Sequence, residues 1–172
     1  MKPLEGVEIR RMTTANLDRV LAIARNLPLA PHWPNSAWLN AITPESTPRR
    51  IALVIGASGA GPRPGPILGF AVASLLPPQA ELETIAVAPE SQQLGLGERI
   101  FQALAAELKA AGVSELQLEV RASNHPALAF YRALGFVKTS LRPSYYADPI
   151  EDAVLMHLPL AWSLLWPPDH PP

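Results

Sequence analysis

The sequence predicts a single domain of the α/β (α+β) class, in which helices pack on a mixed β-sheet. Three observations support this fold class. The chain has 172 residues, a length that suits one domain with a core of ordinary size. Apolar residues make up 48% of it and charged residues 17%, which is typical of a folded protein. The predicted elements run as strands and hairpins first, and then as strand, turn, helix, strand, helix, strand and strand.

The N-terminal half begins with a strand at residues 7–11, where apolar and charged side chains alternate. A helix follows, with Thr13 or Thr14 as its cap and apolar residues at helical spacing. A short helix is predicted near residues 36–42, between prolines. Two apolar stretches on either side of a Gly- and Pro-rich turn predict a hairpin, and one more strand follows it. These three strands are predicted at residues 50–56, 67–75 and 81–87.

The C-terminal half contains the clearest helix, at residues 97–111, whose apolar side chains form one stripe. Gly112 is a natural stop for it. A strand with alternating faces is predicted at residues 114–120. Asn124 then caps a short helix that has Pro126 in its first turn and ends at Gly135. Two more strands are predicted at residues 136–139 and 153–158.

Composition and charge exclude several classes of function. The formal net charge of −1 argues against a broad electrostatic grip on nucleic acid. The chain has no cysteine, and its four histidines lack the spacing of metal ligands, so we expect no metal site. The first residues lack the apolar run of a secretory signal, and the apolar tract at residues 158–166 is far shorter than the ~20 residues that span a bilayer. We therefore expect a cytoplasmic protein.

A glycine-rich turn at residues 92–97, QQLGLG, precedes the long helix. The simplest interpretation is a helix start without a ligand, in which the glycines only allow a tight turn. A dinucleotide site is disfavoured because Ile100 stands where a third glycine is needed. A nucleoside triphosphate loop needs a lysine that the turn lacks. Successive backbone N–H groups at a helix N-terminus also hold a pyrophosphate without a lysine. The residues alone leave the first and the last interpretation open.

The turn and the sequence downstream of it resemble one enzyme family. Gln92-x-x-Gly95-x-Gly97 after a strand is similar to the coenzyme A loop of GNAT-type N-acetyltransferases. The stretch LEVRASNHPALAFYRALGF closely resembles the ribosomal-protein-alanine N-acetyltransferases of the RimI type, as do RPSYY and EDAVLMHLPL further on. The resemblance spans residues 81–160, and the N-terminal half shares only the order of elements.

This resemblance implies a mostly antiparallel sheet that splays between its two central strands. It also implies a GNAT-like domain at residues 1–160, followed by a Trp- and Pro-rich tail at residues 161–172 that has no counterpart in the family. The cofactor is then acetyl-coenzyme A, held by residues on both sides of the turn. The implied cofactor-binding residues are Ile85, Ala86, Val87, Gln92, Gln93, Leu94, Gly95, Leu96, Gly97, Glu98, Asn124 and Tyr131.

The implied reaction moves an acetyl group from a thioester to a primary amine. Glu119 is the implied general base and Tyr131 the implied general acid, which protonates the leaving thiolate. An N-terminal amine with a pKa of about 7.7–8.0 costs only ~1 kcal/mol to deprotonate near pH 7, against ~4–5 kcal/mol for a lysine with a pKa of about 10.4. A carboxylate acting through water is base enough for the N-terminal amine. The Val87 N–H is the implied donor to the thioester oxygen.

Four further residues are assigned to the acceptor side. Glu83 lies four residues before Val87, so strand alternation places it on the same face, where it would help a water relay or attract the amine. Whether Glu83 or Glu119 is the main base stays open. Tyr145, Glu151 and Asp152 fall where the family builds its peptide groove.

The leading hypothesis is acetylation of a protein N-terminus, with the N-terminal alanine of a ribosomal protein as the acceptor. Acetylation of a small-molecule amine or of a lysine side chain is the alternative within the same family. A non-catalytic acyl-coenzyme A-binding protein is the alternative outside enzymes.

Overall fold

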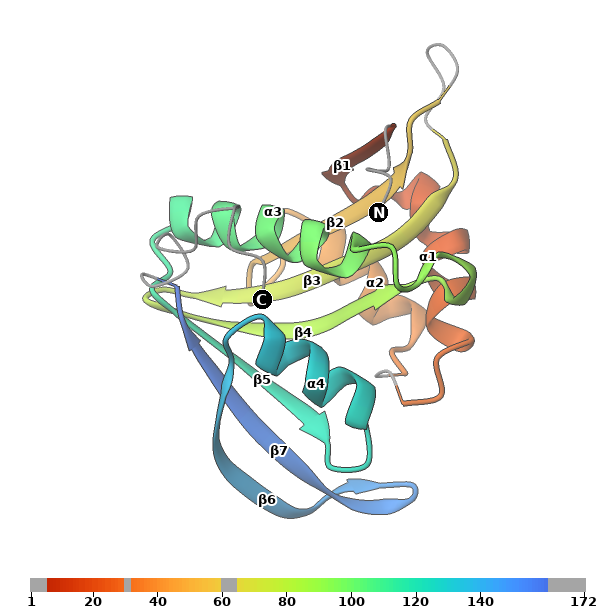
Figure 1. The fold of residues 1–172 in the computed structure, drawn as a ribbon. Coiled ribbons are helices and arrows are strands. Elements are labelled where there is room, and N and C mark those ends of the chain that lie inside the picture. Colours follow the sequence, from red (N-terminus) through yellow and green to blue (C-terminus); the bar gives the residue numbers. More distant parts are fainter. Residues whose placement is uncertain (1–5, 30–31, 60–64, 161–172) are drawn as a thin grey trace.

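A seven-stranded sheet, in the order β1-β2-β3-β4-β5-β7-β6, organises the computed structural model, which describes residues 6–29, 32–59 and 65–160 (Figure 1). The strands are β1 (Val7–Arg11), β2 (Arg50–Ala57), β3 (Ile67–Leu76), β4 (Gln79–Val87), β5 (Glu115–Arg121), β6 (Val137–Ala147) and β7 (Ile150–Pro159). The helices are α1 (Leu17–Arg25), α2 (Asn35–Ile42), α3 (Leu96–Ala110) and α4 (His125–Ala133). The predicted order of elements is confirmed.

One parallel contact joins two antiparallel parts of the sheet. β4 and β5 pair in parallel, and every other neighbouring pair is antiparallel. The β4–β5 register holds only three pairs, from Gln79↔Glu115 to Glu81↔Gln117, after which the two strands diverge. The remainder of β4 pairs only with β3, and the remainder of β5 only with β7. The predicted splay between the two central strands is therefore confirmed.

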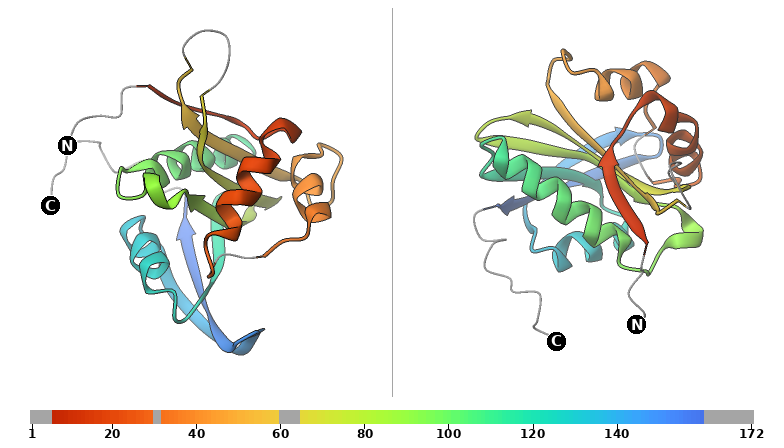
Figure 2. Two further views of the ribbon diagram at one scale, coloured as in Figure 1. Left: turned by 90° about the vertical axis from the view of Figure 1, so that its right-hand side faces the viewer. Right: turned by 90° about the horizontal axis from the view of Figure 1, so that it is seen from above.

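Helices cover both faces of the sheet, as Figure 2 shows. On one face α3 and α4 pack on a core that includes Leu104 and Leu128 together with β5 residues such as Leu116. On the other face α1 and α2 cover a second core, in which Trp38 stacks edge-on against Phe70 at 5.3 Å between ring centroids. The two cores bury apolar surface on either side of β2, β3 and β4, which makes this part of the sheet rigid.

A β-bulge in β4 changes the face on which Glu83 lies. Val72 pairs with Thr84 and Ala73 pairs with Leu82, so Glu83 is an extra residue in the ladder. Alternation is therefore broken between Glu83 and Val87. Val87 packs against the core under α3, whereas Glu83 bonds to Arg50 on the opposite face. The prediction that Glu83 and Val87 share a face is wrong.

The edge strand β6 is longer than the predicted segment at residues 136–139. It runs over eleven residues, and all but one of them are exposed. Its pairing with β7 shifts twice, between Lys138 and Ser140 and between Arg142 and Tyr146. An exposed strand with two shifts has no alternation of apolar and polar residues, which is why periodicity did not reveal it.

The predicted tail at residues 161–172 lies outside the described residues, so the domain boundary at residue 160 stays a prediction. No helix in the described ranges is long and apolar enough to cross a membrane.

Candidate functional site

A cleft of about 590 Å³ opens where β4 and β5 diverge. Leu116, Leu118 and Val120 of β5 point into the core under α3 and α4. By alternation, Gln117 and Glu119 point to the opposite face, and both line the cleft. The cleft therefore lies on the face away from α3 and α4, next to the last β4–β5 pair.

Glu119 forms the centre of a polar cluster in this cleft. Its carboxylate pairs with the guanidinium of Arg142 on β6. Tyr145 lines the same cleft, and its interaction with Glu119, with burial second, raises the pKa of its hydroxyl. The side chain of Glu119 is 19% exposed and that of Arg142 is 53% exposed. A partly buried carboxylate is thus held by a more exposed cation.

Two acids of β4, Glu81 and Glu83, differ in their bonding. Glu83 receives two hydrogen bonds from Arg50, at 2.7 and 3.0 Å, which tie β4 to β2 across β3. Glu81 lines the cleft, and within the described ranges no ion pair or hydrogen bond reaches its side chain. Burial, and then the charges of Glu119 and Glu83, raise the pKa of Glu81.

The predicted phosphate turn presents a row of free backbone donors. The first bond of α3 runs from the Arg99 N–H to the Gly95 oxygen at 3.1 Å. In the described structure the N–H groups of residues 93–98 donate to no protein acceptor. Gln93 and Gly95 adopt left-handed φ angles of 61° and 74°, which turn successive N–H groups to one side. These donors, at the positive end of a 15-residue helix, suit a pyrophosphate.

The C-terminal end of β4 also presents free donors. Ala88 donates to the Leu68 oxygen of β3 at 2.8 Å, so by alternation the N–H groups of Ile85 and Val87 point away from β3, into the splay. The side chain of Gln92 donates to the Val87 oxygen at 3.2 Å and links the strand to the turn. This orientation is what backbone pairing with an extended ligand requires.

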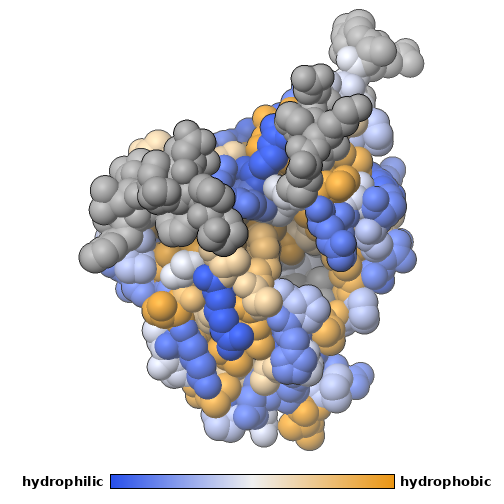
Figure 3. Space-filling view, in the orientation of Figure 1, coloured by the Kyte–Doolittle hydropathy of each residue, from blue (hydrophilic) through white to orange (hydrophobic). Residues whose placement is uncertain are grey.

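Helices α3 and α4 meet at Gly97. A Cβ at this position would lie 3.2 Å from the ring of Phe130, so a larger residue would require that ring to shift. The space-filling view of this face is hollowed between the two helices, with hydrophobic surface beside the hollow (Figure 3). A long, partly apolar ligand therefore has a path from the phosphate turn toward the splay.

Asn124 and Tyr131 come from α4. The Asn124 side chain caps the helix by accepting from the Ala127 N–H at 3.3 Å, as predicted. The Tyr131 ring packs 5.7 Å from that of Phe136, and burial raises the pKa of its hydroxyl above the usual range. After burial, the charge of Tyr146 on β6 also raises the pKa of Tyr131. Burial, and then the charge of Glu119, in turn raise the pKa of Tyr146. Tyr131 packs against the core on the α3 and α4 face of the sheet, whereas Glu119 lines the cleft on the opposite face.

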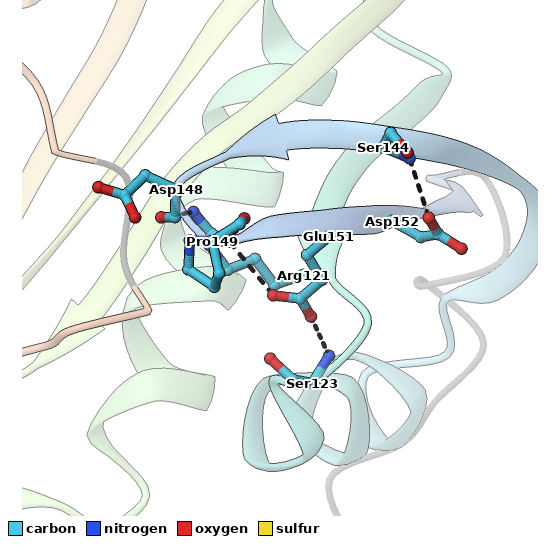
Figure 4. Close-up of polar contacts among 7 residues, drawn as sticks. All are labelled: Arg121, Ser123, Ser144, Asp148, Pro149, Glu151 and Asp152. Atoms are coloured by element: carbon cyan, nitrogen blue, oxygen red, sulfur yellow. Dashed lines mark hydrogen bonds and ion pairs between the residues drawn. The ribbon is translucent and has the colours of Figure 1, made fainter.

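Glu151 and Asp152 are engaged in holding the β6–β7 hairpin, as Figure 4 shows. Glu151 accepts from Arg121 at 3.2 Å and from the Ser123 N–H at 2.5 Å. Asp152 accepts from the Ser144 N–H at 2.9 Å. These bonds do not contradict a groove at this place, but they give the two acids a supporting role there.

The sequence reasoning missed Glu81 and Arg142, which line the cleft, and also Tyr146 of β6. Glu81 belongs to the same ELE pattern as Glu83 and was available from alternation. Arg142 and Tyr146 belong to the RPSYY stretch, but nothing in that stretch says which partner each side chain meets. The Tyr146 ring lies 4.2 Å from the Arg121 guanidinium, and burial raises the pKa of Tyr146 to about 12.

This arrangement suits a reaction between two molecules that enter from opposite faces. One side offers backbone donors and a partly apolar path, and the other offers a carboxylate and tyrosines. A phenol on one face of the sheet and a carboxylate on the other are chemically suited to donate and to accept a proton. In the described ranges no group of three or more His, Asp and Glu side chains is placed to hold a metal ion.

Comparison with known proteins places the chain among acyltransferases. The model of the acetyltransferase (GNAT) family matches residues 28–136. The ribosomal protein bS18-alanine N-acetyltransferase of Escherichia coli K12 is 42% identical over 99 residues, which are 56% of this chain and 67% of that protein. A putative enzyme of the same name from Bacillus subtilis is 29% identical over 148 residues, which are 86% of this chain and 92% of that protein.

A solved structure supports the same grouping. The crystal structure of the ribosomal-protein-alanine N-acetyltransferase from Escherichia coli superposes with a TM-score of 0.73 and 31% identity. The superposition covers 90% of this chain and 94% of that one. The likeness extends over the N-terminal half, where sequence alone matched only the order of elements.

Proposed function

The chain belongs to the acetyltransferase (GNAT) family, and on this premise we propose that it moves an acetyl group from acetyl-coenzyme A to the N-terminal amine of a protein. The acceptor we propose is the N-terminal alanine of a ribosomal protein. One observation carries the proposal: free backbone donors and a polar cleft lie on opposite sides of a single splay between β4 and β5.

The turn before α3 fits the cofactor. The free N–H groups of residues 93–98 would hold the pyrophosphate, and the Ile85 and Val87 N–H groups would pair with the amides of the pantetheine arm. The hollow between α3 and α4 would take that arm, with Asn124 beside it. When bound, acetyl-coenzyme A supplies a thioester whose acetyl group is activated for transfer to an amine.

Val87 has a polarising role in this proposal. Its N–H points into the splay and carries no charge, so it stabilises negative charge that develops on an oxygen without attracting the cationic amine. The bulge at Glu83 fixes this orientation, because it sets which residues of the following segment point into the splay.

Glu119 is the proposed general base. The partly buried carboxylate lies on the acceptor side, where it lines the open cleft together with Tyr145. Taking a proton from an N-terminal amine near pH 7 costs about 1 kcal/mol, which a carboxylate can supply through water.

Tyr131 is the proposed general acid. Burial keeps its hydroxyl protonated throughout the neutral range, because the raised pKa lies far above pH 7. It reaches the splay from the α4 face, where the proposed cofactor lies. It therefore donates a proton on the leaving-group side while Glu119 accepts one on the amine side.

A thiol-release assay tests the proposal. Each reaction contains the protein, acetyl-coenzyme A and one candidate acceptor. The acceptors are Ala-starting peptides, the same peptides blocked at the N-terminus, free lysine, and small polyamines. We expect thiol release with the open Ala-starting peptides and none with the blocked ones. Mass spectrometry then places the acetyl group on the α-amine.

The same assay separates the alternatives. Release with lysine or polyamines alone would overturn the protein N-terminus as acceptor while keeping the family activity. Binding of acetyl-coenzyme A with no release for any amine would favour a non-catalytic acyl-coenzyme A-binding protein.

A further inference from the structure

The ion pair between Glu119 and Arg142 is a feature that the proposed function leaves unused. If Glu119 receives a proton from the acceptor, as the proposed function holds, its position beside a guanidinium is a problem. The guanidinium pairs with the carboxylate, and Glu119, Arg142 and Tyr145 all line the same cleft. An arriving ammonium finds this carboxylate already neutralised.

Arg142 lies at the start of an irregular stretch of β6. The register with β7 shifts between Arg142 and Tyr146, and Ser144 inside this shift has a left-handed φ of 52°. Asp152 fixes the shift by accepting from the Ser144 N–H at 2.9 Å. Arg142 and Tyr145 lie over the same cleft, with the guanidinium 5.5 Å from the tyrosine ring centroid.

Exposure distinguishes this ion pair from two others at the site. The Arg50–Glu83 pair is 17% and 16% exposed, and the Arg121–Glu151 pair is 16% exposed on both sides. Both of those arginines make additional bonds, to the Pro48 oxygen and to the Asp148 oxygen. Arg142 is 53% exposed, and in the described structure its guanidinium makes no further hydrogen bond. It is the cation of this site that can leave at small cost.

We propose that Arg142 is an exchangeable counterion of Glu119. Without an acceptor it neutralises the carboxylate inside the open cleft. The α-ammonium of the acceptor takes its place beside Glu119 and Tyr145, while the guanidinium moves into solvent. The exchange replaces one cation by another, so the charge of the cleft does not change. An uncharged acceptor cannot replace the guanidinium beside the carboxylate. The site therefore selects a cationic amine before it removes the proton.

A double-mutant cycle on peptide binding tests this role. The affinity of an Ala-starting peptide for the protein in the presence of coenzyme A is measured by calorimetry for the wild type, Arg142→Met, Glu119→Gln and the double variant. Removing the competing cation should tighten binding by roughly two- to fivefold, the upper part of the range of a partly exposed ion pair. In the Glu119→Gln background the same substitution should change nothing.

Controls separate exchange from a structural effect. Arg142→Lys keeps the cation and should bind the peptide as the wild type does. Lys138→Met removes an exposed cation from the same strand, without an ion pair in the described structure, and should also leave affinity unchanged. A peptide that begins with a hydroxy acid in place of alanine should gain nothing from Arg142→Met. Weaker or unchanged binding of the Ala-starting peptide to a folded Arg142→Met variant would overturn the proposal, as would an equal gain in the Glu119→Gln background.

The outcomes also separate this inference from the function on which it rests. A wild-type protein that acetylates no peptide N-terminus would remove the proposed function. A wild type that does so, with an Arg142→Met variant that binds no tighter, would remove only the exchange.

Discussion

The two sides of the splay are built from different materials. The side under α3 and α4 is made of backbone: free N–H groups of Ile85, Val87 and residues 93–98, and a glycine where two helices meet. The acceptor side is made of charged side chains from β2, β4, β5 and β6, most of which already have a partner. A ligand on the first side adds bonds that the protein lacks, whereas a ligand on the second must replace bonds that exist. We therefore expect the first side to bind its ligand tightly and the second side to discriminate between acceptors.

The largest expected effect falls on the residue that joins the two sides. Tyr131→Phe removes the hydroxyl and keeps the ring that packs on Phe136. We expect turnover to fall by roughly 10²-fold or more while the affinity for acetyl-coenzyme A stays constant, because only the proton donor is lost. Steady-state kinetics and calorimetry measure the two quantities. Unchanged turnover would remove Tyr131 as the acid.

The next effect tests whether the paired charges of the acceptor side support the structure. Glu83→Gln leaves Arg50 without its partner in a partly buried place, and we expect the free energy of unfolding in urea to fall by roughly 2 kcal/mol. Glu90→Gln breaks the exposed pair with Arg19 and serves as the matched control, with unfolding close to that of the wild type. Equal losses in the two variants would show that burial of the pair is not what matters.

A smaller effect isolates the backbone side. Gly95 and Gly112 both have left-handed φ angles, of 74° and 85°, with open space where a Cβ would lie. Replacing either by alanine should cost about 1 kcal/mol of stability. Only Gly95→Ala should also weaken acetyl-coenzyme A binding, by roughly tenfold, since Gly112 ends α3 at the far side. Equal binding by the two variants would argue against the turn as the pyrophosphate site.

The smallest effect concerns the unpaired acid of the cleft. The pKa of Glu81 is raised in the folded protein by burial and by Glu119 and Glu83, so its charged form costs stability. This cost is absent below the unfolded pKa and appears as pH rises through the folded one. Glu81→Gln should therefore raise the melting temperature at pH 7 by about 1 °C, a value reduced for solvent screening, and should leave it unchanged near pH 3. A gain at both pH values would point to packing instead of charge.

The same contrast explains what could be predicted from the sequence. The turn, α3 and the Asn124 cap lie within one continuous stretch, where local patterns and a family resemblance identify each residue. The polar cleft joins residues that are far apart, such as Arg50 and Glu83, which are 33 positions apart, or Glu119 and Arg142, which are 23 apart. No local pattern encodes such a pair.

The bulge at Glu83 shows most clearly what the sequence could not predict. One additional residue in the β4 ladder reverses the alternation that placed Glu83 beside Val87. Neither β-branching nor glycine marks the position, and the bulge is fixed by the Arg50 bonds from another strand. The face of a residue beyond a bulge can be known only once the register is known.

The three-pair contact between β4 and β5 gives the free protein an incomplete sheet. Backbone N–H groups along the diverging part of β4, those of Ile85 and Val87 among them, have no strand opposite them and are open to hydrogen exchange with water. A bound pantetheine arm would occupy that position as an additional strand does. The cofactor would then be part of the architecture as well as a reactant, and the rigidity of the sheet would rise and fall with the supply of acetyl-coenzyme A.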